Sequence, residues 1–467
     1  MDQTNLAIGR RYEWDARDQL LPPCWVQRNV GSIDPEKGMK DTSRILVSGP
    51  SGQLRKRLLS TLRGAKEIIC VSSFLLADAE IVKELLNTAE RGCRVYLLAA
   101  SEGQLLKEPR EDSEFDDQRR EEHAKLLREL AGHVLVRSAD SFHSKFLLID
   151  PKTRNAGGFL LTANLTTEAL MRNPEMAVEL NTDEAHDLFR QFLIGFWEES
   201  QNELLGPDRL SSVKLLAEKG QSTPPRTILC TTRRIKTIRQ TMLDLIERAD
   251  SEIILSTFGI DSQHPVTQNL LKALAAGKKV RILARPRPSK VTMTALLLLA
   301  KAGAEVRGHP WLHAKALLVG NSGNWHGMIM TSNVEARGLD EGFETGISLR
   351  NNDAEELRTI LEKWWQDFPL RLSLNSKVGD VEGPVQLWRD DKPLRVSIEK
   401  HGLFALGEIE ARSQDEMEQT APSSFPKPSL PKDRTLYHKI SYTWRVLPPK
   451  PLKASEPNRR PTDPKDA

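Results

Sequence analysis

The stretch "HSKFLLID", residues 143–150, has a near-copy in "HAKALLVG", residues 313–320, and this pair determines how we interpret the whole chain. Each copy joins a histidine and a lysine, two residues apart, to an apolar run typical of a buried strand. Polar side chains on a core strand cost free energy unless they are hydrogen-bonded or used. We therefore expect the alternating polar residues to face one shared site: His143, Lys145, His313 and Lys315.

Similar residues follow both copies at matching distances. The segment "LLTANLT" comes after the first copy and "IMTSNVE" after the second, and each supplies a threonine and an asparagine. A glutamate then stands 11 residues beyond each asparagine. A duplication that keeps this many polar residue types in register predicts a site built twice. The matched residues are Thr162, Asn164, Glu175, Thr331, Asn333 and Glu344.

The similarity extends upstream, where "KEIICVSSF" at 66–74 matches "SEIILSTFG" at 251–259. The first half carries an extra charged segment near 108–122, which we expect to be a solvated helix or loop. Each half alternates helices with strands and closes on a Trp-bearing helix. This alternation predicts an α/β fold in two duplicated halves.

Composition changes along the chain set the expected domain limits. The two halves are predicted at 46–204 and 227–370, joined by a Pro-containing linker at 205–226. The remaining regions are an irregular N-terminal extension at 1–45, a small β-rich appendage at 371–447, and a Pro-rich, charged tail at 448–467 that we expect to be disordered.

This pattern resembles the phospholipase D superfamily, whose signature is H-x-K-x4-D followed by G-S/T-x-N and a later glutamate. Asp150 completes the first motif, whereas Gly320 stands at the aspartate position of the second. Leu161 and Met330 replace the glycine that precedes the hydroxyl residue. The resemblance covers roughly residues 50–370. It implies two α/β/α halves related by pseudo-twofold symmetry.

The resemblance also implies a mechanism. One histidine attacks phosphorus to form a covalent phosphohistidine, and the second acts as general acid and then base. The family favours His143 as nucleophile and His313 as acid, although the sequence alone is symmetric. The lysines, asparagines and threonines would hold the non-bridging oxygens, and Glu175 and Glu344 would orient the imidazoles. Asp150 would support its strand. No metal or other cofactor is required.

The substrate is less strongly indicated. Net charge is only +3, so an argument for nucleic acid must be local. The loop "RPRPSK" offers Arg285, Arg287 and Lys290 at a predicted strand end, where they would bind phosphates, and the basic cluster at 226–240 is a weaker candidate. We expect a nuclease acting on DNA or RNA. A phospholipase or phosphatidyltransferase, and a decayed binding module with Gly320 as its sign, remain alternatives.

Three further patterns have plainer explanations. The loop at 45–53 lacks the G-K-[ST] of a phosphate-binding loop, and His309 has no third ligand with which to form a metal site beside His313. In the appendage, the alternating aromatic residues near 440–444 fit a small core better than a base-stacking face. The sequence starts without an apolar leader and has no run long enough to span a bilayer, so we expect a cytoplasmic protein without integral membrane contact, whose protein partners are unknown.

Overall fold

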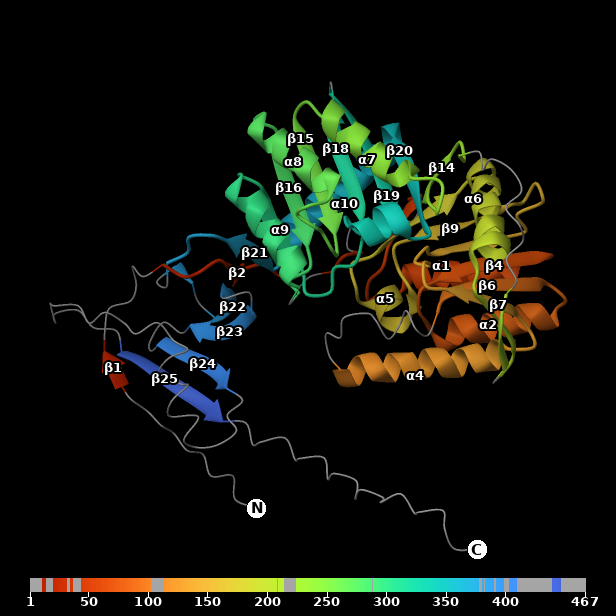
Figure 1. The fold of residues 1–467 in the computed structure, drawn as a ribbon, viewed down its shortest axis with the longest axis horizontal. Coiled ribbons are helices and arrows are strands. Elements are labelled where there is room, and N and C mark those ends of the chain that lie inside the picture. The colour runs from red at the N-terminus through yellow and green to blue at the C-terminus, as the bar shows by residue number, and fades with distance from the viewer. Residues whose placement is uncertain are drawn as a thin grey trace, which may run out of the picture. The chain divides into compact units, whose positions relative to one another are not determined.

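The fold is described from a computed structural model of the chain (Figure 1). It describes residues 11–13, 20–31, 34–36, 43–101, 113–207, 209–213, 224–287, 289–321, 323–377, 380–381, 383–389, 392–398, 403–409 and 439–446. Among these residues, no helix is both long and apolar enough to cross a bilayer. The predicted tail at 448–467 and the middle of the predicted linker lie outside the described residues.

The first half is a mixed sheet with helices packed on it. Its strands, apart from the short pair β5 (Leu76–Ala77) and β10 (Leu165–Thr166), are β3 (Ile45–Val47), β4 (Ile68–Ser73), β6 (Arg94–Ala100), β7 (Leu135–Ala139), β8 (Phe146–Ile149), β9 (Gly157–Leu161), β11 (Met176–Leu180), β12 (Asn202–Gly206) and β13 (Arg209–Ser212). Its helices are α1 (Gln53–Gly64), α2 (Ala79–Glu90), α4 (Ser113–Leu130), α5 (Thr167–Met171), α6 (Thr182–Ile194) and the π-helix η1 (Gly195–Glu199).

The second half repeats this plan in green and cyan in Figure 1. Its strands are β14 (Ile228–Thr231), β15 (Glu252–Thr257), β16 (Lys279–Ala284), β17 (Glu305–Gly308), β18 (Ala316–Asn321), β19 (Asn324–Met330), β20 (Glu344–Arg350) and β21 (Leu370–Ser373). Its helices are α7 (Thr237–Arg248), α8 (Pro265–Ala275), α9 (Lys290–Lys301), α10 (Asn351–Asp367) and the π-helix η2 (Arg337–Glu341).

The strand order confirms the predicted duplication. The first sheet contains β7-β6-β4-β8-β9-β11-β3, and the second contains β17-β16-β15-β18-β19-β20-β14 in corresponding positions. In both sheets the first three of these strands are parallel, and the strand that follows the H-x-K motif runs antiparallel to the central one. The central strand β4 is buried along its whole length, as expected when helices cover both faces of a sheet.

The halves share one apolar core. A single cluster of buried residues contains Phe142 and Phe192 from the first half together with Phe343 and Trp364 from the second. The first predicted Trp-bearing helix is formed by α6 and the π-helix η1, which holds Trp197, and the second is α10; all three contribute to the core. Because this core is continuous across the halves, the two copies of the motif are held in one rigid frame.

The extra segment of the first half falls partly in α4. The loop and helix between β6 and β7 are longer than those between β16 and β17, and the loop at 102–112 lies outside the described residues. The buried His123 of α4 accepts a hydrogen bond from the backbone N–H of Leu76 through Nδ1, 3.0 Å away. Burial lowers the pKa of His123 to about 4, so this side chain is neutral at neutral pH. The expected solvated helix is therefore anchored to the fold.

We expected the H-x-K residues to lie on strands, but they come just before the strands. β8 begins at Phe146 and β18 at Ala316, one residue after each lysine. The preceding backbone N–H groups of His143 and Ser144 donate to the carbonyl of Phe343 in the other half, at 3.1 and 2.9 Å. The motif leaves its own sheet because its hydrogen-bond partners belong to the opposite half.

The chain ends form a separate unit, residues 1–27 and 375–467. Within it, β2 (Cys24–Gln27) pairs with β22 (Gly383–Arg389), which pairs with β23 (Lys392–Ile398). A second small sheet has the order β1 (Arg11–Glu13), β25 (Lys439–Val446) and β24 (Leu403–Ile409). The N-terminal extension therefore supplies strands to the C-terminal β-rich region, which sequence patterns treated separately. The side chains of Ile440, Tyr442 and Trp444 lie outside what the structure describes.

Candidate active site

Each histidine of the two motifs is hydrogen-bonded to a glutamate of the opposite half. Nδ1 of His143 lies 2.8 Å from Oε1 of Glu344, and Nδ1 of His313 lies 2.6 Å from Oε1 of Glu175. Both glutamates are buried, whereas the histidine side chains keep 21% and 15% of their surface exposed. With Nδ1 engaged, Nε2 of each imidazole is the nitrogen available for chemistry.

Backbone hydrogen bonds also hold each motif against the opposite half. The N–H of His313 donates to the carbonyl of Pro174, 3.2 Å away, as the N–H of His143 does to that of Phe343. Pro174 and Phe343 each directly precede a paired glutamate. Each motif is therefore attached to the segment that carries its own glutamate partner, and the two imidazoles meet in one site.

The two threonines orient the glutamates, which corrects our expectation that they hold phosphate oxygens. The hydroxyl of Thr162 donates to Oε2 of Glu175 at 2.5 Å, and the hydroxyl of Thr331 donates to Oε2 of Glu344. Both threonines are fully buried. Since each hydroxyl proton is committed to a carboxylate, neither is free to bind a phosphate oxygen.

The two lysines lie under the site without solvent exposure. Nζ of Lys315 is 2.9 Å from Nε2 of His313, whereas Nζ of Lys145 donates to the carbonyl of His143, 2.5 Å away. Burial lowers the pKa of Lys315 to about 7, with Glu175 opposing the shift and Lys145 adding to it. The second half thus couples its lysine directly to the imidazole of its histidine.

Burial and the lysines also set the protonation of the two histidine–glutamate pairs. Burial lowers the pKa of His143, and that of His313 is lowered still further by burial together with Lys315 and Lys145. Burial raises the pKa of Glu175 to about 7. Burial also acts to raise the pKa of Glu344, but His143 and Lys145 outweigh it and leave that pKa below its ordinary value. Both imidazoles are therefore neutral at neutral pH, and Glu344 is ionised.

The histidines open into a cleft of about 870 Å³ that is lined from both halves, with Asn164 and Asn333 in its wall. The Oδ1 atoms of both asparagines are buried, and no hydrogen-bond partner for them is found among the residues that the structure describes. Nδ2 of Asn333 donates to Oε1 of Glu335, 3.1 Å away. Sequence reasoning missed Glu335, although it follows the second T-x-N directly.

Two phenylalanines, also missed, lie against the imidazoles of the two motifs. The ring of Phe74 meets His143 edge-on at 5.2 Å, and that of Phe258 meets His313 at 4.9 Å. Phe74 is the last residue of the segment "KEIICVSSF", and Phe258 is the last but one of its match "SEIILSTFG", so each half has a phenylalanine near the end of this segment. Such contacts fix the ring orientation of the histidines.

The structure brings two of the three predicted substrate-binding residues to the cleft. The guanidinium of Arg287 stacks over Phe258 at 4.2 Å and that of Arg285 at 5.4 Å, and both line the cleft. Lys290 instead lies exposed on the first turn of α9, outside the cleft lining. The cleft also receives Arg119 from α4, which no sequence pattern indicated.

The carboxylate of Asp150 is hydrogen-bonded to the backbone at the start of β4. Its carboxylate accepts hydrogen bonds from the backbone N–H groups of Lys66, Glu67 and Ile68, at 2.7 to 3.2 Å, where β4 begins. At the corresponding end of β18, a Cβ atom on Gly320 would lie 2.6 Å from Oγ of Ser251. Ser251 therefore occupies the space that a side chain at 320 would need.

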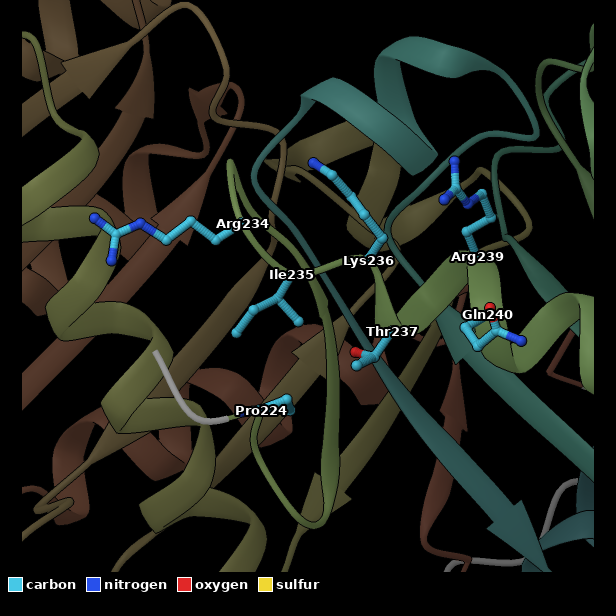
Figure 2. A pocket seen from close by; sticks show the side chains of 7 residues that line it. All are labelled: Pro224, Arg234, Ile235, Lys236, Thr237, Arg239 and Gln240. Atoms are coloured by element: carbon cyan, nitrogen blue, oxygen red, sulfur yellow. The ribbon is translucent and has the colours of Figure 1, made fainter. Parts of the chain in front are cut away.

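The basic cluster at 226–240 lines a separate pocket of about 560 Å³ at the start of α7. Figure 2 shows the side chain of Arg234 directed away from those of Lys236 and Arg239. Lys236 donates to the carbonyl of Thr232, and Arg239 pairs with Asp340. These cations do not converge on one ligand position.

His309 has a packing role. It is buried, its Nδ1 accepts from the backbone N–H of Trp311 at 3.2 Å, and its ring packs 5.1 Å from Phe368. Within the described ranges, no group of three histidine, cysteine, aspartate or glutamate residues is arranged to hold a metal ion.

Comparison with curated proteins gave no match. Among solved structures, the chain is similar to phosphatidylserine synthase from Haemophilus influenzae, with 13% identity, a TM-score of 0.48, and coverage of 77% of this chain and 91% of that one. It is also similar to polyphosphate kinase from Porphyromonas gingivalis, with 16% identity, a TM-score of 0.46, and coverage of 69% of this chain but 50% of that one. The chain is also similar to Nuc, a phospholipase D family member from Salmonella typhimurium, with 18% identity, a TM-score of 0.27, and coverage of 31% of this chain and 97% of that one. The chain thus spans half the length of the polyphosphate kinase.

The family model described as "Cardiolipin synthase, PLD-like domain" matches residues 58–197 and 242–365, which are more than half of the chain. The two matched segments fall in the two structural halves, and each contains one H-x-K motif. The chain belongs to the phospholipase D-like family.

Proposed function

We propose that the protein is a phosphodiesterase that cleaves nucleic acid through a covalent phosphohistidine formed on His143. The observation that carries the proposal is the crossed pairing of His143 with Glu344 and of His313 with Glu175. It supports a single site in which two imidazoles act on opposite sides of one phosphorus atom. The family acts on phosphodiesters, and the choice of nucleic acid over lipid is our inference.

His143 fits the nucleophile better than His313 does. Its Nδ1–H donates to the ionised Glu344, which leaves the Nε2 lone pair directed away from that bond. In His313, Nε2 already lies within hydrogen-bond distance of Lys315. Nε2 of His143 would attack phosphorus, and the bond from phosphorus to the leaving oxygen would break.

His313 would protonate the leaving oxygen and then remove a proton from the water that attacks the phosphohistidine. Hydrolysis breaks the P–N bond and restores His143. The positive charges of Lys315 and Lys145 hold the pKa of His313 down in the empty site, after burial itself. An anionic phosphodiester offsets these charges and raises that pKa, so binding substrate favours the protonated acid.

The lysines and asparagines would hold the non-bridging oxygens. Lys145 and Lys315 are buried beside the histidines, and Asn164 and Asn333 line the same cleft. Donors fixed in a buried site stabilise the charge that develops on these oxygens, typically by roughly 10²–10³ in rate for one donor. Since side chains supply both charge and proton transfer, we expect full activity in excess chelator.

Nucleic acid is favoured by Arg285 and Arg287, which stack on Phe258 beside His313. Further phosphates of a strand would reach these guanidinium groups. Affinity that depends on such contacts falls with salt, with a slope of about −0.7 per phosphate contact for single strands and −0.9 for duplex.

The test is the salt dependence of kcat/KM on single- and double-stranded oligonucleotides, with phosphatidylglycerol vesicles assayed in parallel. Replacing both Arg285 and Arg287 with alanine should flatten the slope by about 1.4 to 1.8 units. The matched control replaces Arg63 and Arg190, whose side chains are 62% and 65% exposed outside the cleft lining, and should keep the wild-type slope. Headgroup release from vesicles without oligonucleotide cleavage would overturn the assignment.

A further inference from the structure

The two ends of the cleft have opposite character although they are built on equivalent positions of the duplicated fold. We name them by the nearer histidine. The His143 end is lined by Phe74, Asp140, Ser141, Glu341 and Gly342, and the His313 end by Asn173, Phe258, Arg285 and Arg287. Arg172 adjoins the His313 end, because it donates to Oδ1 of Asn173 at 3.2 Å and stacks over Trp311.

The His143 end is acidic, with Phe74 as its aromatic ring. The carbonyl of Ser141 accepts from the N–H of Phe343 at 2.7 Å, which places Ser141 against the segment that contains Glu341 and Gly342. Asp140 and Glu341 both line the cleft here. Arg337 also lines the cleft and lies on the same π-helix as Glu341, so among the described side chains two carboxylates face a single guanidinium.

The His313 end is aromatic and basic. The guanidinium of Arg172 stacks over Trp311 at 4.5 Å, and the indole keeps 42% of its surface exposed. Arg287 stacks over Phe258, whose ring lies 4.9 Å from His313. Burial is the main cause of the lowered pKa values of His309 and His313, and Arg285 is close enough to add to both, at His313 after Lys315, Lys145 and His143.

Other charged residues in and near the cleft do not remove this difference in charge between its two ends. Near Arg172, Glu168 is partnered by Arg119, 3.6 Å away. Two other carboxylates of the cleft are bonded within the second half: Glu335 holds Asn333, and Asp261 accepts from the N–H of Gln263 at 2.9 Å. These bonds come from neutral donors and leave both negative charges in place, but the guanidinium groups of Arg172, Arg285 and Arg287 outnumber these two carboxylates among the described residues.

Because the fold is duplicated, the side chains of the two ends can be compared at equivalent backbone positions. Ser141 and Trp311 each stand two residues before a catalytic histidine. Glu341 and Arg172 each stand three residues before a paired glutamate. Equivalent backbone positions thus carry a small residue and an acid at one end, and an indole and a base at the other.

We propose that this asymmetry fixes the direction in which the substrate lies: the leaving group carries an additional phosphate, and the group retained on His143 does not. The inference rests on the proposed function. When Nε2 of His143 attacks phosphorus, the leaving oxygen departs on the opposite side, where His313 protonates it. The leaving nucleotide then lies at the His313 end, where guanidinium groups bind its next phosphate and Trp311 or Phe258 stacks on its base. A second phosphate on the retained nucleotide would face Asp140 and Glu341, which repel it.

The experiment uses the full chain and three thymidine dinucleotides: TpT, pTpT with an added 5′ phosphate, and TpTp with an added 3′ phosphate. Whether TpT yields 3′- or 5′-thymidine monophosphate identifies the nucleoside that is retained. Bis(p-nitrophenyl) phosphate reports phosphodiesterase activity without nucleosides. We expect the phosphate added to the leaving nucleoside to raise kcat/KM about tenfold over TpT, as a charge-assisted contact would, and the phosphate added to the retained nucleoside to lower it.

Variants test the source of each effect, with every rate divided by that variant's own rate on TpT. Arg172→Gln and Arg287→Gln should remove most of the gain on the leaving side and leave the penalty on the retained side. Glu341→Gln should reduce that penalty and leave the gain.

Equal effects of the two added phosphates, or a gain on the retained side, would overturn the proposed direction while the nuclease assignment stands. Hydrolysis of bis(p-nitrophenyl) phosphate without cleavage of any dinucleotide would overturn both. A gain on the leaving side that survives both arginine substitutions would show that the His313 end does not bind the added phosphate.

Discussion

Nδ1 of His143, in the first half, lies 2.8 Å from Oε1 of Glu344, in the second, so neither half contains a complete histidine–glutamate pair. Glu344 is ionised and acts to raise the pKa of His143 against the effect of burial. Removing this charge must therefore lower the pKa of His143 further.

We expect Glu344→Gln to lower the pKa of His143, measured by NMR titration of the imidazole, and to reduce turnover because the ring loses its orienting acceptor. Glu175→Gln is the matched control, since Glu175 is hydrogen-bonded to His313 and not to His143. A larger change at His143 from Glu175→Gln than from Glu344→Gln would contradict the crossed pairing.

The pairing of each histidine with the glutamate of the other half could not be predicted from the sequence. Repetition of Asn164, Glu175 and their counterparts predicted which residues share a site, because spacing survives duplication. It did not indicate that His143 takes its glutamate from the other half, since that depends on how the halves pack. The threonines illustrate the same limit: Thr162 was placed at the site, but its hydroxyl binds Glu175.

Asp150 should matter for stability more than for catalysis. Its carboxylate accepts from the backbone N–H groups of Lys66, Glu67 and Ile68. Asp150→Asn turns one acceptor oxygen into a donor and leaves N–H groups unsatisfied, at a cost of about 1–3 kcal/mol in the free energy of unfolding. Asparagine suits this position, where φ is 46°.

Denaturant titration measures this loss, and the exposed Asp183→Asn is the control, expected to change stability by less than about 0.5 kcal/mol. Turnover of the folded Asp150→Asn protein should stay near that of the wild type. A variant that is fully stable but inactive would place Asp150 in the chemistry instead.

We expect aspartate to be tolerated at position 320, and tolerated better when the side chain at position 251 is smaller. A Cβ atom at 320 meets Oγ of Ser251 at 2.6 Å, and overpacking of this kind costs about 1–3 kcal/mol. We expect Gly320→Asp to lower the melting temperature and the added Ser251→Ala to recover part of it. Because the position lies at the end of β18, kcat/KM should change by less than about tenfold. Robust activity appearing only in Gly320→Asp would show that the natural protein is a decayed enzyme.

Glu175 makes stability depend on pH in a predictable direction. Burial raises its pKa from 4.5 to about 7, so the folded protein binds a proton more tightly than the unfolded chain does. The stabilising contribution is complete below the unfolded pKa and is lost as pH rises through about 7. Glu175→Gln removes the charge that must otherwise be buried. Its melting temperature relative to wild type should therefore be higher at pH 8 than at pH 5. A difference that is constant with pH, or that reverses, would contradict the raised pKa.

The most direct test of one shared site with His143 as nucleophile is to trap the intermediate. Thymidine 5′-(p-nitrophenyl phosphate) has a leaving group that needs little protonation, so His313→Ala should still form the phosphohistidine, but without His313 as base water should release it slowly. We predict a burst of about one equivalent of nitrophenol and a thymidine phosphate adduct that peptide mass mapping places on His143, absent from the His143→Ala/His313→Ala double variant. An adduct on another residue, or an adduct that persists in the double variant, would contradict the account.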